Sequence, residues 1–184
     1  MMGSPLSAIL GNLFLEHIES EFLHLFPAIQ PSFWLRYVDD IISLVRPDFD
    51  LVDQFLCFIN NLYPTLKFTY EWESGEKIPF LDVLIHNCKT HLKFSVFRKP
   101  TNSESYLHFF SFNEIHIKVG LAQSLFLRAH RVCSAEFLKP EIEHIFQSLK
   151  KHGYPRKILN KAQKKLKKEK TMNVKKMIAV ILEK

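Results

Sequence analysis

Cysteine and glycine are both scarce in this sequence of 184 residues. The three cysteines are Cys57, Cys88 and Cys133, and an odd number without a Cys-x-x-Cys pair argues against a disulfide framework and a zinc finger. Five glycines exclude collagen-like and glycine-rich sequences. No apolar run reaches the roughly 18 residues of a membrane span, and no secretory signal pattern is present. We therefore expect a soluble, intracellular protein that is not secreted and has no membrane partner.

Charge is unevenly distributed along the chain. Apolar residues make up 47% and charged residues 24% of the sequence, the balance of a folded domain rather than a disordered chain. Residues 150–184 hold 13 Lys or Arg but only two Glu, whereas residues 1–149 carry more acidic than basic groups. A basic tail beside an acidic body favours a polyanionic partner, above all nucleic acid. On charge alone, a solvated lysine-rich helix without a ligand remains the alternative.

Hydrophobic periodicity predicts a mixed α/β portion up to about residue 98, followed by an all-helical portion. The apolar spacing in the first portion predicts helices over residues 4–26 and 48–62. Alternating and β-prone runs predict strands over 33–38, 41–45, 66–73, 81–85 and 92–96, packed together as one antiparallel arrangement. The second portion is expected to contain helices over 115–133 and 135–152, ended by Gly153, and a basic helix from Pro155.

An acidic doublet, Asp39-Asp40, separates two hydrophobic strands by the two residues of a tight hairpin turn. Two carboxylates in apolar surroundings would need a cation, because a buried unpaired charge costs several kcal/mol. Hard cations such as Mg²⁺ bind carboxylate oxygens, and two of them can stabilise the attacking and leaving oxygens of phosphoryl transfer. Without further context, however, an exposed turn explains the doublet better, because Asp is common in turns.

In context, the doublet resembles the catalytic motif of reverse transcriptases. Tyr37-Val38-Asp39-Asp40 is preceded by Gly3-Ser4-Pro5-Leu6-Ser7 at the start of a long helix, an arrangement similar to the palm of these polymerases. The chain resembles in particular the enzymes of Penelope-like retroelements, over roughly residues 2–155. The similar stretches, taken in order, are 2–7, 34–40, 66–71, 79–83, 97–101 and 124–129.

This resemblance implies an α+β fold in three parts. Residues 1–98 would form a partial reverse-transcriptase palm, an antiparallel sheet with helices on one face. Residues 99–153 would form an all-helical, thumb-like region that also resembles a helix-turn-helix, and residues 154–184 a basic helical tail. The implied activity is RNA-directed DNA polymerisation by two-metal nucleotidyl transfer. It brings Mg²⁺ or Mn²⁺ as cofactor, an RNA template and a DNA primer as partners, and the nucleus as location.

The resemblance also assigns roles to individual residues. Asp39 would bind the catalytic metal ions directly, with Asp40 as a less directly coordinated partner. The other positions are Gly3, Ser4, Pro5 and Tyr37 for nucleotide and template, Phe80, Leu81 and Asp82 for the primer, and Arg98, Lys99, Lys118, Arg128 and Arg131 for the nucleic-acid backbone. Asp82 is explained equally well as a strand-end carboxylate paired with Lys or Arg. Lys67 is better explained as a solvent-facing lysine than as a general acid.

Three parts of the family pattern have no counterpart in the sequence: the upstream strand with a further metal-binding aspartate, the fingers, and a following endonuclease. Asp39 and Asp40 alone would bind metal weakly. We therefore interpret the chain as the second half of a reverse transcriptase, whose exposed hydrophobic surface favours self-association. The alternative is a non-catalytic, helix-turn-helix-like nucleic-acid-binding module with a basic tail, for which the palm remnant serves as scaffold.

This interpretation predicts that the purified chain has no polymerase activity by itself, because the doublet lacks the further carboxylate that bridges the two ions. Primer extension with Mg²⁺ and deoxynucleotides tests the prediction. Template-dependent synthesis that is lost in Asp39→Asn would contradict it.

Overall fold

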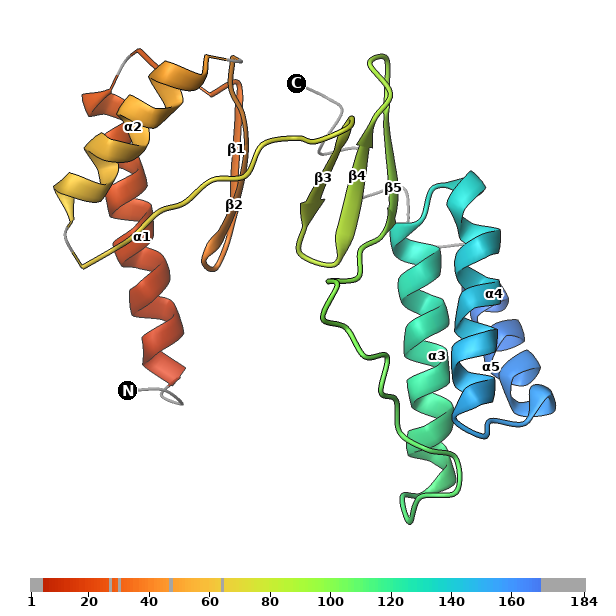
Figure 1. Cartoon of the computed structure of the whole chain (residues 1–184). Helices are drawn as coiled ribbons and strands as arrows, with labels where there is room; N and C mark the ends of the chain where they lie inside the picture. Colours follow the sequence, from red (N-terminus) through yellow and green to blue (C-terminus); the bar gives the residue numbers. More distant parts are fainter. Residues whose placement is uncertain (1–4, 27, 30, 47, 64, 170–184) are drawn as a thin grey trace. The chain divides into compact units, whose positions relative to one another are not determined.

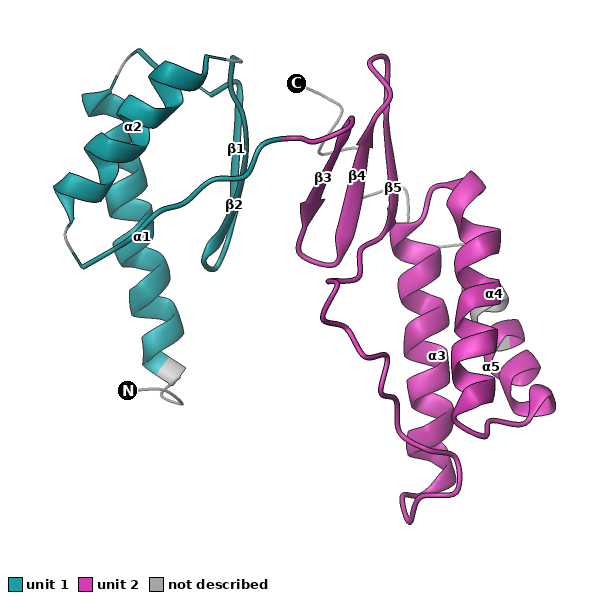
Figure 2. Ribbon diagram, in the orientation of Figure 1, with its two compact units in different colours: residues 1–72 teal, residues 73–184 magenta. Residues whose placement is uncertain are grey.

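The computed structural model describes residues 5–26, 28–29, 31–46, 48–63 and 65–169, and its elements are labelled in Figure 1. The expected positions Gly3 and Ser4 and the tail beyond residue 169 lie outside these ranges. The chain divides into two compact units, residues 1–72 (unit 1) and 73–184 (unit 2) (Figure 2). In the described part of the chain, no helix combines the length and apolar character needed to cross a membrane.

Unit 1 contains two helices and one hairpin. Its elements are α1 (Pro5–Leu25), β1 (Phe33–Tyr37), β2 (Asp40–Leu44) and α2 (Phe49–Leu62). The core consists of five buried side chains, Ile18, Phe22, Ile29, Phe55 and Ile59. The first half of α1 contributes nothing to this core, because Leu6, Ile9, Leu10 and Leu13 are all more than half exposed. The expected exposed hydrophobic surface is therefore present on α1.

The second predicted helix is confirmed as α2. Asp48 caps it, because its carboxylate accepts a hydrogen bond of 3.0 Å from the Leu51 amide. The apolar stripe then buries Phe55 and Ile59 against α1, where the rings of Phe55 and Phe22 are 5.6 Å apart. The N-cap thus fixes where this helix begins, and its apolar face fixes which side is buried, as the sequence indicates.

The predicted strand over 66–73 is wrong, because the described residues of this segment pair with no other strand. Hydrogen bonds of the kind that a neighbouring strand would supply come instead from the side chain of Asn60 in α2. Its side chain donates to the Phe68 carbonyl (3.0 Å) and accepts from the Phe68 amide (2.7 Å). Further along, Trp72 packs on Phe49 with ring centroids 4.7 Å apart. The alternating pattern is real, but the segment lies extended along α2.

Unit 2 combines a three-stranded antiparallel sheet with three helices. The elements are β3 (Lys77–Phe80), β4 (Val83–Asn87), β5 (Leu92–Val96), α3 (Ile115–Val132), α4 (Ala135–Lys151) and α5 (Arg156–Glu169). The helices share one core, which includes Phe126, Ile145, Leu149 and Leu159. The predicted helices over 115–133 and 135–152 are confirmed, and Gly153, with φ +80°, follows α4 in the left-handed conformation that glycine favours.

The described strands form two separate sheets rather than the single sheet that we expected. Strand β5 is joined to the helices instead: the Ser134 amide donates to the Phe94 carbonyl (2.8 Å), and the Phe94 amide donates to Ser134 Oγ (2.9 Å). These bonds give the amide and carbonyl of Phe94, on the free edge of β5, partners at the α3–α4 turn. Because unit 2 begins at residue 73, the boundary expected at residue 98 lies inside this unit. The fold is α+β, as predicted.

Asn60→Ala is expected to lower the free energy of unfolding by about 1–3 kcal/mol, because the partly buried amide and carbonyl of Phe68 lose both partners. Urea denaturation measures this loss. Asn61→Ala is the matched control on the same helix: Asn61 is exposed, and its side-chain amide lies 3.5 Å from the Cys57 sulfur. Both changes gain the same helix propensity, so equal stability of the two variants would refute the role of Asn60.

Candidate nucleic-acid interface

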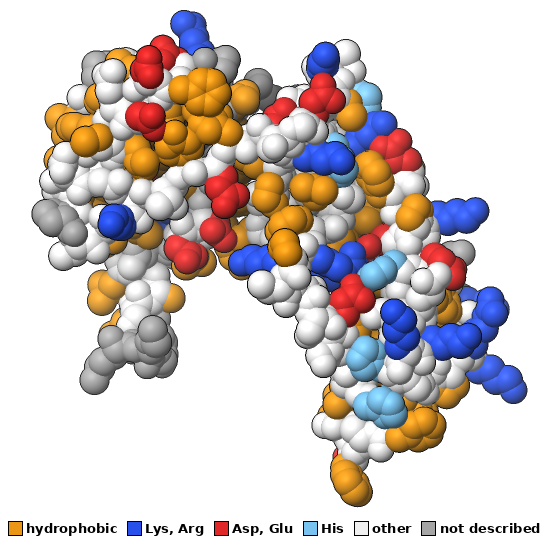
Figure 3. All heavy atoms as spheres, in the orientation of Figure 1, with side chains coloured by type: hydrophobic (Ala, Val, Ile, Leu, Met, Phe, Trp, Pro, Cys, Tyr) orange, Lys and Arg blue, Asp and Glu red, His pale blue; other side chains and the backbone are white. Residues whose placement is uncertain are grey.

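Helix α5 presents a strongly basic surface. Seven of its fourteen residues are Lys or Arg. Leu159 and Ala162 are buried against the core, whereas Arg156, Lys157, Lys161 and Lys164 are exposed. Lys150 and Lys151 are exposed at the end of α4. We call these six cations the basic face, and Figure 3 shows Lys and Arg side chains gathered over α4 and α5.

Among the described residues, the six cations of the basic face have no acidic partner. Within the described residues, no carboxylate forms an ion pair with any of them. A cationic helix without acidic partners has an electrostatic potential suited to a polyanion, and lysines on such a helix commonly contact phosphates. The basic tail of the sequence is therefore, over its described part, a surface of unpaired charge.

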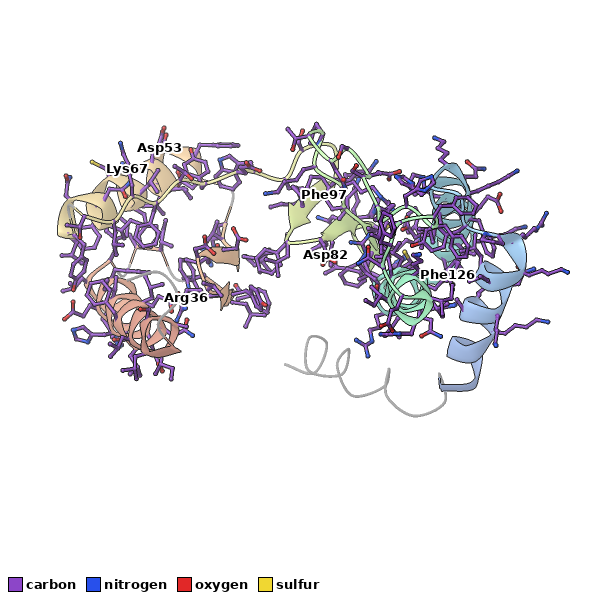
Figure 4. The ribbon with its side chains drawn as sticks, turned by 90° about the horizontal axis from the view of Figure 1, so that it is seen from below. Arg36, Asp53, Lys67, Asp82, Phe97 and Phe126 are labelled. Atoms are coloured by element: carbon purple, nitrogen blue, oxygen red, sulfur yellow. The ribbon has the colours of Figure 1, made fainter. Side chains whose placement is uncertain are left out.

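A second cationic region surrounds the turn between β3 and β4. A hollow of about 350 Å³ is lined by Leu81, Asp82, Phe97, Arg98, Lys99, Thr101, Asn102 and Arg128. This hollow brings together Leu81 and Asp82, which the resemblance assigns to the primer, and three cations that it assigns to the nucleic-acid backbone: Arg98, Lys99 and Arg128. Asp82 and Phe97 are joined through the backbone, where the Phe97 amide donates to the Asp82 carbonyl (2.8 Å), and both are labelled in Figure 4. Phe80, the third primer residue, is half-buried in β3.

Asp82 lies 3.9 Å from Arg128, an ion pair between partly exposed side chains. This is the alternative that the sequence left open for Asp82, a strand-end carboxylate paired with an arginine. Leu81, beside it, has φ +54°, a conformation that costs an ordinary residue of order 1–3 kcal/mol. The turn is thus held in a strained shape with its carboxylate already engaged.

Arg98 is a structural cross-link. Its guanidinium donates two hydrogen bonds to Glu141 of α4, at 2.9 and 2.5 Å, and its Nε lies 3.0 Å from Glu104. The bonds to Glu141 raise the pKa of Arg98 against the opposite effect of burial. Burial acts to raise the pKa of Glu104, but bonds from His144 and Ser148 and the charge of Arg98 hold that pKa below its ordinary value. A phosphate at Arg98 would have to displace these two carboxylates.

The other cations that the resemblance assigns to the nucleic-acid backbone divide into one buried lysine and three side chains that are exposed or partly exposed. Lys118 is only 7% exposed; its ammonium donates to the Ser111 carbonyl (2.7 Å) and lies over the Phe109 ring. It therefore holds a loop in place. Lys99 and Arg131 are exposed. Of the five expected cations, these two and the partly exposed Arg128 have side chains that can reach a ligand directly.

The acidic doublet of unit 1 lies on a hairpin tip, one residue displaced from the prediction. The turn consists of Val38 and Asp39, and Asp40 is the first residue of β2, paired with Tyr37. Val38 has φ +57°, which a β-branched residue strongly disfavours, so its sequence gives no turn signal. Arg36 fixes the turn by donating to the Val38 carbonyl (3.2 Å).

Arg36 also attaches the hairpin to α1. Its Nε lies 2.9 Å from Glu19, and Nη1 donates to Asn12 Oδ1 at 3.0 Å (Figure 4). The doublet is consequently carried on a hairpin held against α1. Two residues that the resemblance assigns to the nucleotide and template lie in these elements: Pro5 is the first residue of α1, and Tyr37, the last residue of β1, is 62% exposed.

A small hollow of about 160 Å³ adjoins this turn and brings Asp39 and Lys67 to one site, with Arg36 and Glu19 also in its wall. Asp39 and Asp40 are both exposed. Among the described residues, no group of three or more His, Cys, Asp or Glu could hold a metal ion. Two neighbouring, exposed carboxylates are by themselves a weak set of ligands for Mg²⁺ or Mn²⁺.

Sequence reasoning passed over residues 108–112, His-Phe-Phe-Ser-Phe, which precede α3. Phe110 is 78% exposed and Phe112 fully exposed. The sequence feature that could have pointed to these exposed side chains is the density of Phe in a segment with neither helical nor strand periodicity.

Glu141→Gln is expected to lower the free energy of unfolding by about 2–3 kcal/mol, because a nearly buried carboxylate is removed from Arg98. Glu143→Gln, two residues along α4 and exposed, is the matched control and should change stability by less than about 0.5 kcal/mol. Thermal or urea unfolding measures both. If Glu141→Gln is as stable as Glu143→Gln, Arg98 is not the cross-link described.

The helical part of unit 2 is similar to a known kind of domain. A family model described as an animal helix-turn-helix domain matches residues 105–164, which include α3, α4 and most of α5. No curated protein and no solved structure matches the chain. The similarity thus covers about a third of the sequence, and it is the third that carries the basic face.

Proposed function

We propose that residues 105–164 are a nucleic-acid-binding helix-turn-helix whose contact surface is the basic face. The supporting observation is that the matched helices bury one side of α5 and leave its cations exposed and unpaired within the described residues. Nothing in this proposal requires catalysis. It agrees with the alternative interpretation of the sequence, a binding module with a basic tail.

The packing of the three helices favours α5 as the contacting helix. The α3–α4 turn is bonded to β5 through Ser134. The first turn of α4 also faces the sheet, because Phe137 stacks on His86 with ring centroids 4.6 Å apart. Glu136 bonds Lys93 at 2.9 Å. These contacts occupy the beginning of α4, whereas the described outer side of α5 carries exposed cations of the basic face.

The basic face can supply two kinds of contact. Its lysines and arginine would neutralise phosphates, which fixes the position of a duplex without reading its sequence. Asn160 is exposed between Lys157 and Lys161, and a side-chain amide can bond the edge of adenine in the major groove. An exposed helix with this composition is therefore suited to lie in a groove, with phosphates on both sides.

A second candidate, supported by a different observation, is that unit 1 is part of a reverse-transcriptase palm. The support is the strained Val38-Asp39 turn, held against α1 by Arg36. Residues held in strained backbone conformations cluster at functional sites. Titration of the purified chain with Mn²⁺ tests this candidate separately from nucleic-acid binding: the palm interpretation predicts weak metal binding that is lost in Asp39→Asn, and metal binding that this change leaves unaltered, or no metal binding at all, would contradict it.

Lys157→Gln/Lys161→Gln should weaken binding to double-stranded DNA, because fewer phosphates are neutralised. The slope of log affinity against log salt should fall by about 0.9 for each phosphate that the variant no longer neutralises. Fluorescence anisotropy over a range of salt concentrations measures both effects. Lys77→Gln/Lys89→Gln removes two exposed lysines, one from β3 and one from the β4–β5 turn, and is the matched control. Equal salt slopes for the two variants would exclude α5 as the contact.

A further inference from the structure

The loop before α3 ends in an exposed apolar surface. Phe110 and Phe112 are the most exposed large hydrophobic side chains of the described residues, and Ile115 (54%) and Ile117 (46%) follow at the start of α3. We call these four side chains the aromatic tip. Figure 3 shows hydrophobic side chains at this end of unit 2. Exposed apolar side chains gathered at one place typically mark a contact with another molecule.

The aromatic tip is held in a defined position by its neighbours. Phe109 turns inward, with its ring centroid 5.3 Å from that of Tyr154, and its amide donates to the His152 carbonyl (2.9 Å). The buried Lys118 holds the Ser111 carbonyl between the two exposed phenylalanines. Because these bonds order the loop before any ligand arrives, a ligand would bind with little further loss of conformational entropy.

Phe110 of the aromatic tip adjoins the α4–α5 turn, which lies between the two groups of cations of the basic face. A Cβ atom on Gly153 would lie 3.2 Å from the Phe110 ring, so this ring rests directly on the turn. Four cations of the basic face flank that turn in sequence: Lys150, Lys151, Arg156 and Lys157. Aromatic rings beside a basic helix are typical of proteins that bind unpaired bases, where the cations contact phosphates and the rings stack on bases.

We propose that Phe110 and Phe112 stack on unpaired bases of a nucleic acid whose phosphates lie on the basic face. The preferred ligand would be a duplex interrupted by unpaired bases. This inference rests on the proposed function and adds the class of ligand. Charge complementarity favours nucleic acid, and the size of the tip argues against a membrane surface, because peripheral membrane helices present an apolar face along their length. The tip consists of one loop and the first turn of α3.

The experiment compares two DNA ligands, a fully paired duplex and the same duplex with a short bulge that contains 2-aminopurine. Anisotropy gives the affinity, and quenching of 2-aminopurine reports stacking of an aromatic ring on the unpaired base. Phe110→Ser/Phe112→Ser should weaken binding to the bulged duplex at least about fivefold, abolish the quenching, and leave binding to the paired duplex unchanged. Leu92→Ser, which changes a partly exposed apolar residue of β5, is the control and should have neither effect.

The outcomes separate the two proposals. If the wild-type chain binds both duplexes equally and the double variant changes nothing, the aromatic tip does not contact bases, while the proposed function stands. If the wild-type chain binds neither duplex, the proposed function fails. If the double variant keeps its DNA binding but loses binding to phosphatidylcholine–phosphatidylserine vesicles, the tip contacts membrane and the inference is overturned.

Discussion

Burial of Leu159 and Ala162 is the constraint on which the proposed contact surface of this chain depends. A helix in which half the residues are Lys or Arg has little tendency to form by itself, because its like charges repel. Full burial of a leucine side chain contributes about 1.5–3 kcal/mol, and here this contribution fixes which side of α5 faces the core. The cations of the basic face are exposed as a direct consequence. The same narrow apolar stripe thus orders the helix and orients its charge.

The sheet of unit 2 supports this arrangement from the other side of the helices. Ser134 joins β5 to the α3–α4 turn, and Arg98 joins the end of the sheet to Glu141 of α4. Lys118 performs a related task for the loop that carries the aromatic tip. Two cations that the resemblance assigned to phosphate are therefore part of the framework. The proposed contact with nucleic acid is left to cations that no carboxylate holds within the described residues.

The sequence predicts the positions of helices and strands better than it predicts which of them pair or pack together. Both helices that flank Gly153, the capped helix after Asp48 and the hairpin of the acidic doublet follow from local patterns. The strand expected over 66–73 does not form, because Asn60 bonds the backbone of Phe68, and no pattern in the segment itself reports a side chain on the preceding helix. The separation into two sheets depends likewise on long-range packing. The turn at Val38-Asp39 was misplaced by one residue, since its conformation is one that valine rarely adopts.

For the candidate site, the net charge of the tail predicts a polyanionic ligand, but the sequence alone does not separate exposed cations from those held inside the fold. Arg98 and Lys118 look like any other basic residue until Glu141 and Ser111 are seen beside them. The aromatic tip is the converse case: Phe residues are usually core residues, and only the structure shows that Phe109 is directed inward while Phe110 and Phe112 are exposed.

The most direct test of this account is a lysine-reactivity footprint, in which the chain is acylated with and without double-stranded DNA and the modified sites are read by mass spectrometry. The account predicts protection of Lys151, Lys157, Lys161 and Lys164, with Lys77 and Lys89 unchanged. Protection confined to the sheet lysines, or a pattern that DNA does not alter, would contradict it.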